Sequence, residues 1–76
     1  MNNPRRQAIQ NLKDKLDQIQ DELESIQNQE EEYRDNIPEN LQGSEKYEKA
    51  ENSCDNLYEA VSNLAVAIEC LETASE

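Results

Sequence analysis

Apolar side chains recur along the first half of the chain at alternating steps of three and four residues. The series contains one polar member and consists of Ile9, Leu12, Leu16, Ile19, Leu23, Ile26, Glu30 and Tyr33. A seven-residue repeat with apolar positions a and d is typical of a helix that packs one narrow stripe against a partner. The pattern therefore predicts a helix over about residues 4–35, with Ile9 at a and Leu12 at d. Asn3 is the expected N-cap, and Pro4 suits the first turn.

The second half of the chain repeats this spacing over a wider arc. Its series is Tyr47, Ala50, Cys54, Leu57, Val61, Leu64, Ile68 and Leu71. Further apolar residues occupy the flanking positions e (Tyr58, Ala65) and g (Ala60, Ala67, Ala74). A helix that is apolar over such an arc usually contacts more than one neighbour. We therefore expect a helix over about residues 44–74, capped by Ser44, with self-association through Leu57, Tyr58, Val61, Leu64, Ala65, Ile68 and Leu71.

The segment between the two series, about residues 36–43, is expected to form a short connection. Pro38 disfavours helical backbone at Ile37 and so ends the first helix. Ile37 and Leu41 are expected to fold back over the end of the seam. A connection of this length favours an antiparallel helical hairpin. The predicted fold class is thus all-α, with residues 1–76 forming one coiled-coil-type hairpin domain that assembles into a four-helix bundle dimer.

Charged residues support the antiparallel topology. The chain carries 18 acidic and seven basic residues, a formal net charge of −11. Four of the basic residues precede Leu16, whereas none follows Ala50, so a hairpin places a basic start beside an acidic end. At the tip, Lys46 and Lys49 are expected to face four acids: Glu30, Glu31, Glu32 and Asp35. Each such surface pair contributes little stability, so the pattern selects topology more than it stabilises the fold.

Composition alone would also permit a disordered chain. Apolar residues make up 34 % of the sequence, which is low for a globular domain, and charged residues make up 33 %. Two uninterrupted eight-member heptad series, each bounded by a capping residue, argue against disorder.

The chain offers few residues suited to catalysis or to metal binding. The chain has no histidine, so the serine and cysteine residues lack the commonest general base, and a histidine-containing metal site is excluded. Cys54 and Cys70 would lie about 24 Å apart on one helix, too far for a disulfide bond. We expect a non-enzymatic protein without cofactor or metal. There is no apolar leader and no membrane-length run, which predicts a cytoplasmic protein that does not contact membranes.

The acidic excess disfavours direct binding to nucleic acid, because phosphate backbones repel it. An RNA-binding helical-hairpin dimer would share this architecture but would need a basic face. An alternative function is a nucleic-acid-mimicking inhibitor that binds a basic host protein involved in defence or DNA handling. Against this alternative, charged faces usually serve only to solvate the helices and keep a protein soluble. The candidate partner-binding acids are Glu30, Glu31, Glu32, Glu51, Asp55 and Glu59.

Three parts of the sequence carry a resemblance to known proteins. They are the opening Asn3-Pro4-Arg5-Arg6-Gln7, the linker from Asn36 to Glu45, and the Ala/Leu/Glu-rich final segment. In these features the chain resembles small acidic proteins encoded by phages and prophages of Gram-positive bacteria, whose function is unassigned. The resemblance implies a phage or prophage context, a bacterial host cytoplasm and a protein partner, and it assigns no functional residues.

Overall fold

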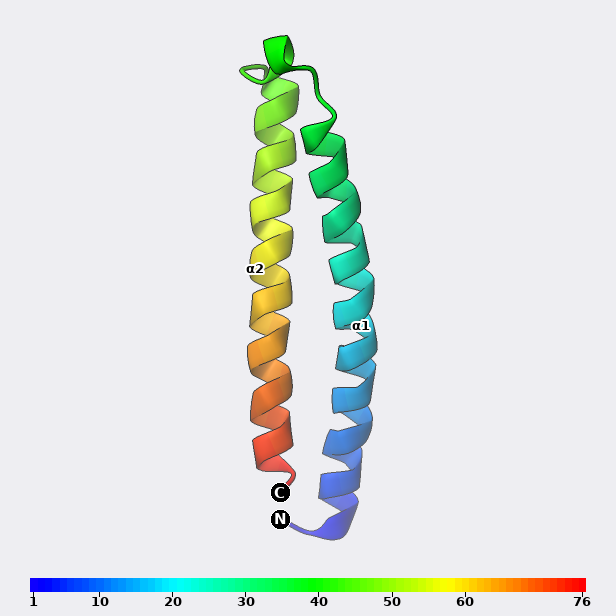
Figure 1. Cartoon of the computed structure of the whole chain (residues 1–76). Coiled ribbons are helices and arrows are strands. Elements are labelled where there is room, and N and C mark those ends of the chain that lie inside the picture. The colour runs from blue at the N-terminus through cyan, green and yellow to red at the C-terminus, as the bar shows by residue number, and fades with distance from the viewer.

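A computed structural model of the chain describes all residues, 1–76, as an antiparallel helical hairpin (Figure 1). Helix α1 spans Asn3–Asp35, a single 3₁₀ turn η1 spans Glu39–Leu41, and helix α2 spans Glu45–Ala74. The two long helices contact one another, and both termini lie at the same end of the rod. The Cα trace measures 59 × 14 × 13 Å. The predicted all-α hairpin is confirmed, and neither helix is long and apolar enough to cross a membrane.

The helix starts are fixed by side-chain caps. The Asn2 Oδ1 atom accepts a hydrogen bond of 2.9 Å from the backbone N–H of Arg5, so the N-cap of α1 is Asn2 and the prediction of Asn3 was one residue late. At α2, the Ser44 Oγ atom accepts from the backbone N–H of Tyr47 at 3.3 Å, which confirms Ser44 as the cap. Each cap satisfies one of the backbone donors that a helix start leaves unpaired.

At the tip of the hairpin, only one of the two apolar residues of the connection covers the end of the contact between the helices. Ile37, placed before Pro38, is buried. Leu41 belongs to η1 and is exposed, contrary to the expectation that both would cover the seam. The reason is the 3₁₀ turn, in which the backbone N–H of Leu41 bonds to the Pro38 carbonyl and directs the following chain into α2.

The buried core of the hairpin is small and lies almost entirely on α2. Only four of the 76 residues are buried: Ile37, Ala50, Cys54 and Ile68. No residue of α1 is buried. Two helices offer one line of contact, so the other seam side chains, such as Leu16 and Leu23, stay partly open to water.

Helix α1 is rotated about its axis relative to the symmetric a/d seam that its sequence predicts. Its d residues are exposed, whereas its polar e residues are half-buried: Arg6, Lys13, Gln20, Gln27 and Arg34. The a residues, such as Leu16 and Leu23, lie between these two rows and are half-buried against α2. The expectation that both apolar rows of α1 would face α2 was therefore wrong for the d row. Long polar side chains cover the contact line with their aliphatic stems, and the polar ends of Lys13 and Gln20 reach partners on α2.

Candidate functional site: an apolar flank

On one side of the hairpin, which we call the polar flank, e residues of α1 make polar contacts with α2. The Lys13 ammonium lies 3.3 Å from a carboxylate oxygen of Glu72 and 3.2 Å from one of Asp17. Further along, the Gln20 amide donates to the backbone carbonyl of Val61 at 3.5 Å. The contact between Lys13 and Glu72 confirms that the basic start of α1 lies beside the acidic end of α2. It also shows that e faces e, as antiparallel helices require.

The opposite side of the hairpin is an apolar flank. It is formed on α1 by the exposed d row and on α2 by the half-buried d row with the neighbouring g alanines. Its members are Leu12, Ile19, Ile26 and Tyr33 on α1, and Leu57, Ala60, Leu64, Ala67, Leu71 and Ala74 on α2. The Lys46 ammonium, at position g of α2, lies 5.6 Å from the centre of the Tyr33 ring. This cation–π contact places the d row of α1 and the g row of α2 on the same side.

The exposure of the α1 d row is unusual for a small protein. Four large apolar side chains at seven-residue intervals are each 44 % exposed or more, and they follow the helix from Leu12 to Tyr33. Scattered apolar residues on a surface are ordinary, whereas a repeated row of large ones beside the leucines of α2 is a candidate interaction surface. The heptad pattern of the sequence includes this row, but the pattern predicts that the row lies in the contact between the two helices and not on the surface.

The predicted self-association residues of α2 fall on three different sides of the helix. Leu57, Leu64 and Leu71 are half-buried and border the apolar flank. Val61 and Ile68 occupy position a and face α1, with Ile68 buried there. Tyr58 and Ala65 are exposed on the polar flank, in the same row as Glu72. The structure therefore brings three of the seven onto one outward surface together with the row from α1.

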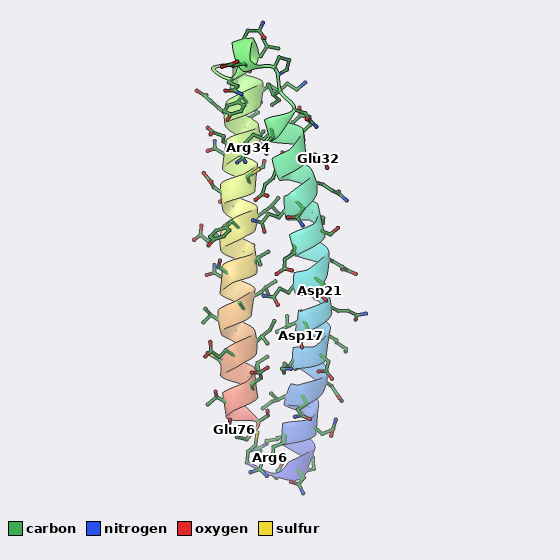
Figure 2. All side chains as sticks on the ribbon, in the orientation of Figure 1. Arg6, Asp17, Asp21, Glu32, Arg34 and Glu76 are labelled. Carbon is green, nitrogen blue, oxygen red and sulfur yellow. The ribbon has the colours of Figure 1, made fainter.

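The predicted acidic partner-binding residues also spread around the rod. Glu30 and Glu31 are half-buried near the contact line, and Glu32 is exposed on α1 (Figure 2). On α2, Glu51, Asp55 and Glu59 are exposed. By heptad position, Glu51 lies on the polar flank, whereas Glu59 and Glu32 lie on the outer sides of their helices. These six acids surround the tip half and do not form a single row.

The expected ion pairs across the tip are not formed. Lys49 pairs with Glu45 on its own helix at 3.2 Å, and Arg34 pairs with its neighbour Asp35 at 3.1 Å. Lys46 lies over Tyr33. Arg34 belongs to the half-buried e row and is directed toward α2 (Figure 2). Arg34 and Lys49 thus pair with acids one and four residues away in the sequence. Such local pairs cost less side-chain entropy than pairs between the two helices.

Negative charge is concentrated in the tip half of the rod. The contact between Gln20 and Val61 divides the hairpin near its middle. Residues 20–60 carry 13 acidic and three basic side chains, a net charge of −10. Residues 1–19 and 61–76 together carry five acidic and four basic side chains, a net charge of −1. The molecule is thus an acidic tip joined to a nearly neutral base.

The two cysteines differ in environment. Cys54 is buried at a seam position of α2, and burial raises the pKa of its thiol. The charge of Arg34 lowers the pKa of this thiol, and the charges of Glu30 and Glu31 raise it, both with smaller effects than burial. Cys70 is exposed, and both cysteines are free. No group of three or more Cys, Asp or Glu side chains is arranged to hold a metal ion.

Comparison with known proteins adds no assignment, because the chain matches no protein-family model, no curated protein and no solved structure.

Proposed function

We propose that this protein is a non-enzymatic acidic helical hairpin that self-associates and acts by binding another protein. The observation that carries the proposal is the exposed apolar row of α1, from Leu12 to Tyr33, next to a core of only four buried residues. A hairpin with so little buried surface gains stability from any partner that covers this row. The resemblance to phage and prophage proteins favours a bacterial cytoplasm as the setting.

Self-association is tested by sedimentation equilibrium of the wild-type chain across the micromolar range. The expected result is a mass above that of the 8.8 kDa monomer, rising with concentration toward a defined oligomer. A chain that stays monomeric at tens of micromolar would overturn the self-association part of the proposal. Protein binding is tested separately, by affinity capture from a Gram-positive host with the tagged wild type and with an Ile26→Asp control.

A second candidate function is inhibition of a basic nucleic-acid-binding protein by mimicry. The observation that favours it is the net charge of −10 in the tip half, in which all but three charged side chains are acidic. Spaced carboxylates on a rigid rod attract basic grooves and speed association at low salt. Duplex DNA should then displace the captured host protein, and high salt should weaken the complex strongly. Capture that persists under both conditions would exclude mimicry.

The matched control for mimicry is a triple substitution, Glu30→Gln, Glu31→Gln and Glu32→Gln. It removes two acidic charges near the contact line and one on the outer side of α1, and it leaves the apolar flank unchanged. Loss of host-protein capture with unchanged self-association is the expected result for a mimic. Unchanged capture would assign binding to another surface.

A further inference from the structure

We propose that the apolar flank binds the same flank of a second copy of this chain in a two-fold antiparallel dimer, with the two tips at opposite ends. This inference rests on the proposed self-association and assigns its surface and its geometry. The occupant is a second copy because the row geometry and the size of the face fit one, and the distribution of charge then selects its orientation. Each argument is independent of the others.

The rotation of α1 is the first argument. In a bundle of four helices, each helix contacts two neighbours, and its apolar stripe divides between them. Here the a row of α1 faces α2, while the d row faces outward beside Leu57, Leu64 and Leu71. The hairpin therefore has the form of one half of a four-helix bundle, with a second contact line that is apolar along α1 and, on α2, from Leu57 to Ala74.

The α1 row is complementary to itself when one copy is reversed. Its members are evenly spaced by seven residues, and its midpoint lies between Ile19 and Ile26. A two-fold axis at this midpoint sets Ile19 against Ile26 of the partner subunit. The same axis sets Leu12 against Tyr33 of the partner subunit. On α2, the alanines of the flank allow the facing helices to approach closely.

The size of the face is the second argument. The whole side of the rod, 59 Å long and 14 Å wide, has an area of roughly 800 Å², which is about what each partner contributes to a stable dimer interface. The apolar row from Leu12 to Tyr33 follows about 32 Å of this length, and polar residues make up the rest. A short peptide or a single helix would cover only one of the two apolar rows. A second hairpin of the same length covers the α1 row over its full extent and also contacts the leucines of α2.

Charge selects the orientation. A dimer with both tips at one end would place a net charge of −10 beside another −10. The antiparallel dimer places each acidic tip half beside a base half of net charge −1, which holds four of the seven basic residues. Like charges brought together at an interface disfavour that arrangement, so repulsion favours the antiparallel dimer.

The surface is tested by sedimentation equilibrium of two matched variants. Ile19→Asp introduces a carboxylate into the centre of the α1 row, where the side chain is already 44 % exposed and the hairpin can remain folded. The two-fold axis places two substituted residues in the interface, one from each copy, and each would bury a carboxylate. We therefore expect the dimer dissociation constant to rise by at least about 100-fold. Val66→Asp adds the same charge at an exposed site on the outer side of α2 and should leave dimerisation unchanged. Circular dichroism checks that both variants remain helical.

The orientation is tested by distances between spin labels, which do not depend on a disruptive variant. Gln42→Cys labels the tip and Asn2→Cys the base, each in a chain carrying Cys54→Ala and Cys70→Ser. In the antiparallel dimer, each label should report a distance close to the 59 Å rod length, whereas a mixture of the two labelled chains should add a short distance. A short tip-to-tip distance would overturn the proposed orientation.

The outcomes separate this inference from the proposed function. A wild-type chain that is monomeric overturns self-association and this dimer together. An oligomer that survives Ile19→Asp, or that dissociates on Tyr58→Asp on the polar flank, overturns the apolar flank as the interface and leaves self-association standing. A dimer lost with Ile19→Asp and retained with Val66→Asp, with tips far apart, supports both.

Discussion

Ile19 and Gln20 are neighbours in the sequence, and each lies in the environment expected for the polarity of the other. The apolar Ile19 side chain is 44 % exposed, whereas the polar Gln20 is half-buried and donates a hydrogen bond to the Val61 carbonyl across the hairpin. The same inversion recurs one heptad earlier, where Leu12 is exposed and Lys13 reaches Glu72. This repeated inversion shows that the helix as a whole is rotated, so it is not a local irregularity.

The first prediction is that the stability of the wild-type protein depends on its concentration. Because the proposed dimer forms from the folded hairpin and not from the unfolded chain, dimerisation should stabilise the folded state by mass action, and the melting temperature should rise as the protein is concentrated. Ile26→Gln, at a side chain that is 50 % exposed in the hairpin, should remove most of this dependence. Thermal melts by circular dichroism over a 100-fold range of concentration measure it. A concentration-independent wild type would contradict the prediction.

The second prediction concerns the core of the hairpin. Ile68 is one of its four buried residues and faces α1, so Ile68→Ala should lower the free energy of unfolding by about 2–4 kcal/mol. Val66 lies two residues away on the same helix and is 60 % exposed. Val66→Ala should change the stability by no more than about 0.5 kcal/mol. Urea unfolding at one fixed protein concentration compares the two variants.

The third prediction concerns the start of α2. Ser44→Ala removes the acceptor for the Tyr47 backbone N–H and should cost about 1 kcal/mol. Ser53→Ala is the matched control, because Ser53 is exposed in the interior of α2 and alanine is the better helix former. Urea unfolding should show the first variant destabilised and the second neutral or slightly stabilised. Equal effects of the two substitutions would exclude a capping role for Ser44.

The fourth prediction concerns thiol reactivity. Cys70 is exposed, whereas Cys54 is buried and has a raised pKa, so little of its reactive thiolate forms near neutral pH. A disulfide reagent at pH 8 should therefore label one thiol per chain quickly and the second slowly. Cys70→Ser should remove the fast phase and leave the slow one. In urea, both thiols should react at similar rates.

The fifth prediction is a loss of stability at alkaline pH. Burial raises the pKa of Cys54 above its ordinary value of 9.0, so the unfolded chain loses this proton at a lower pH than the folded chain does. The contribution of the Cys54 thiol to the free energy of unfolding is therefore fully present below pH 9.0. It falls as the pH rises toward the pKa that this thiol has in the folded chain. The pKa of Lys13 is also raised, by hydrogen bonds to Asp17 and Glu72, and its contribution is lost only above its ordinary 10.5.

Urea midpoints between pH 8 and pH 10 separate these two groups. The wild type should lose stability over this window, whereas Cys54→Ala should lose distinctly less, whatever its stability at pH 8. Cys70→Ser should behave as the wild type, because its thiol is exposed. A Cys54→Ala variant with the full wild-type slope would show that the buried thiol is not the cause.

The sequence alone determined the two helices, their antiparallel order and the Ser44 cap. It could do so because these features depend on local signals: heptad spacing, Pro38, capping side chains and the separation of basic and acidic segments. The same spacing could not say which neighbour each apolar row faces, because an a/d stripe is equally consistent with one partner or with two. The polar e residues decide which neighbour each row faces, because they occupy part of the contact with α2. Their spacing in the sequence does not distinguish side chains that stay in water from side chains that contact the other helix.

Only the tertiary structure decided that α1 turns its a row to α2 and its d row outward. Lys13 and Gln20 bind α2 with their polar ends and occupy the width of contact that Leu12 and Ile19 would otherwise fill. Two helices meet along a single line, so they can bury only part of two apolar stripes. The physical consequence is a rod with a small core, an acidic tip and a long apolar flank open to a partner.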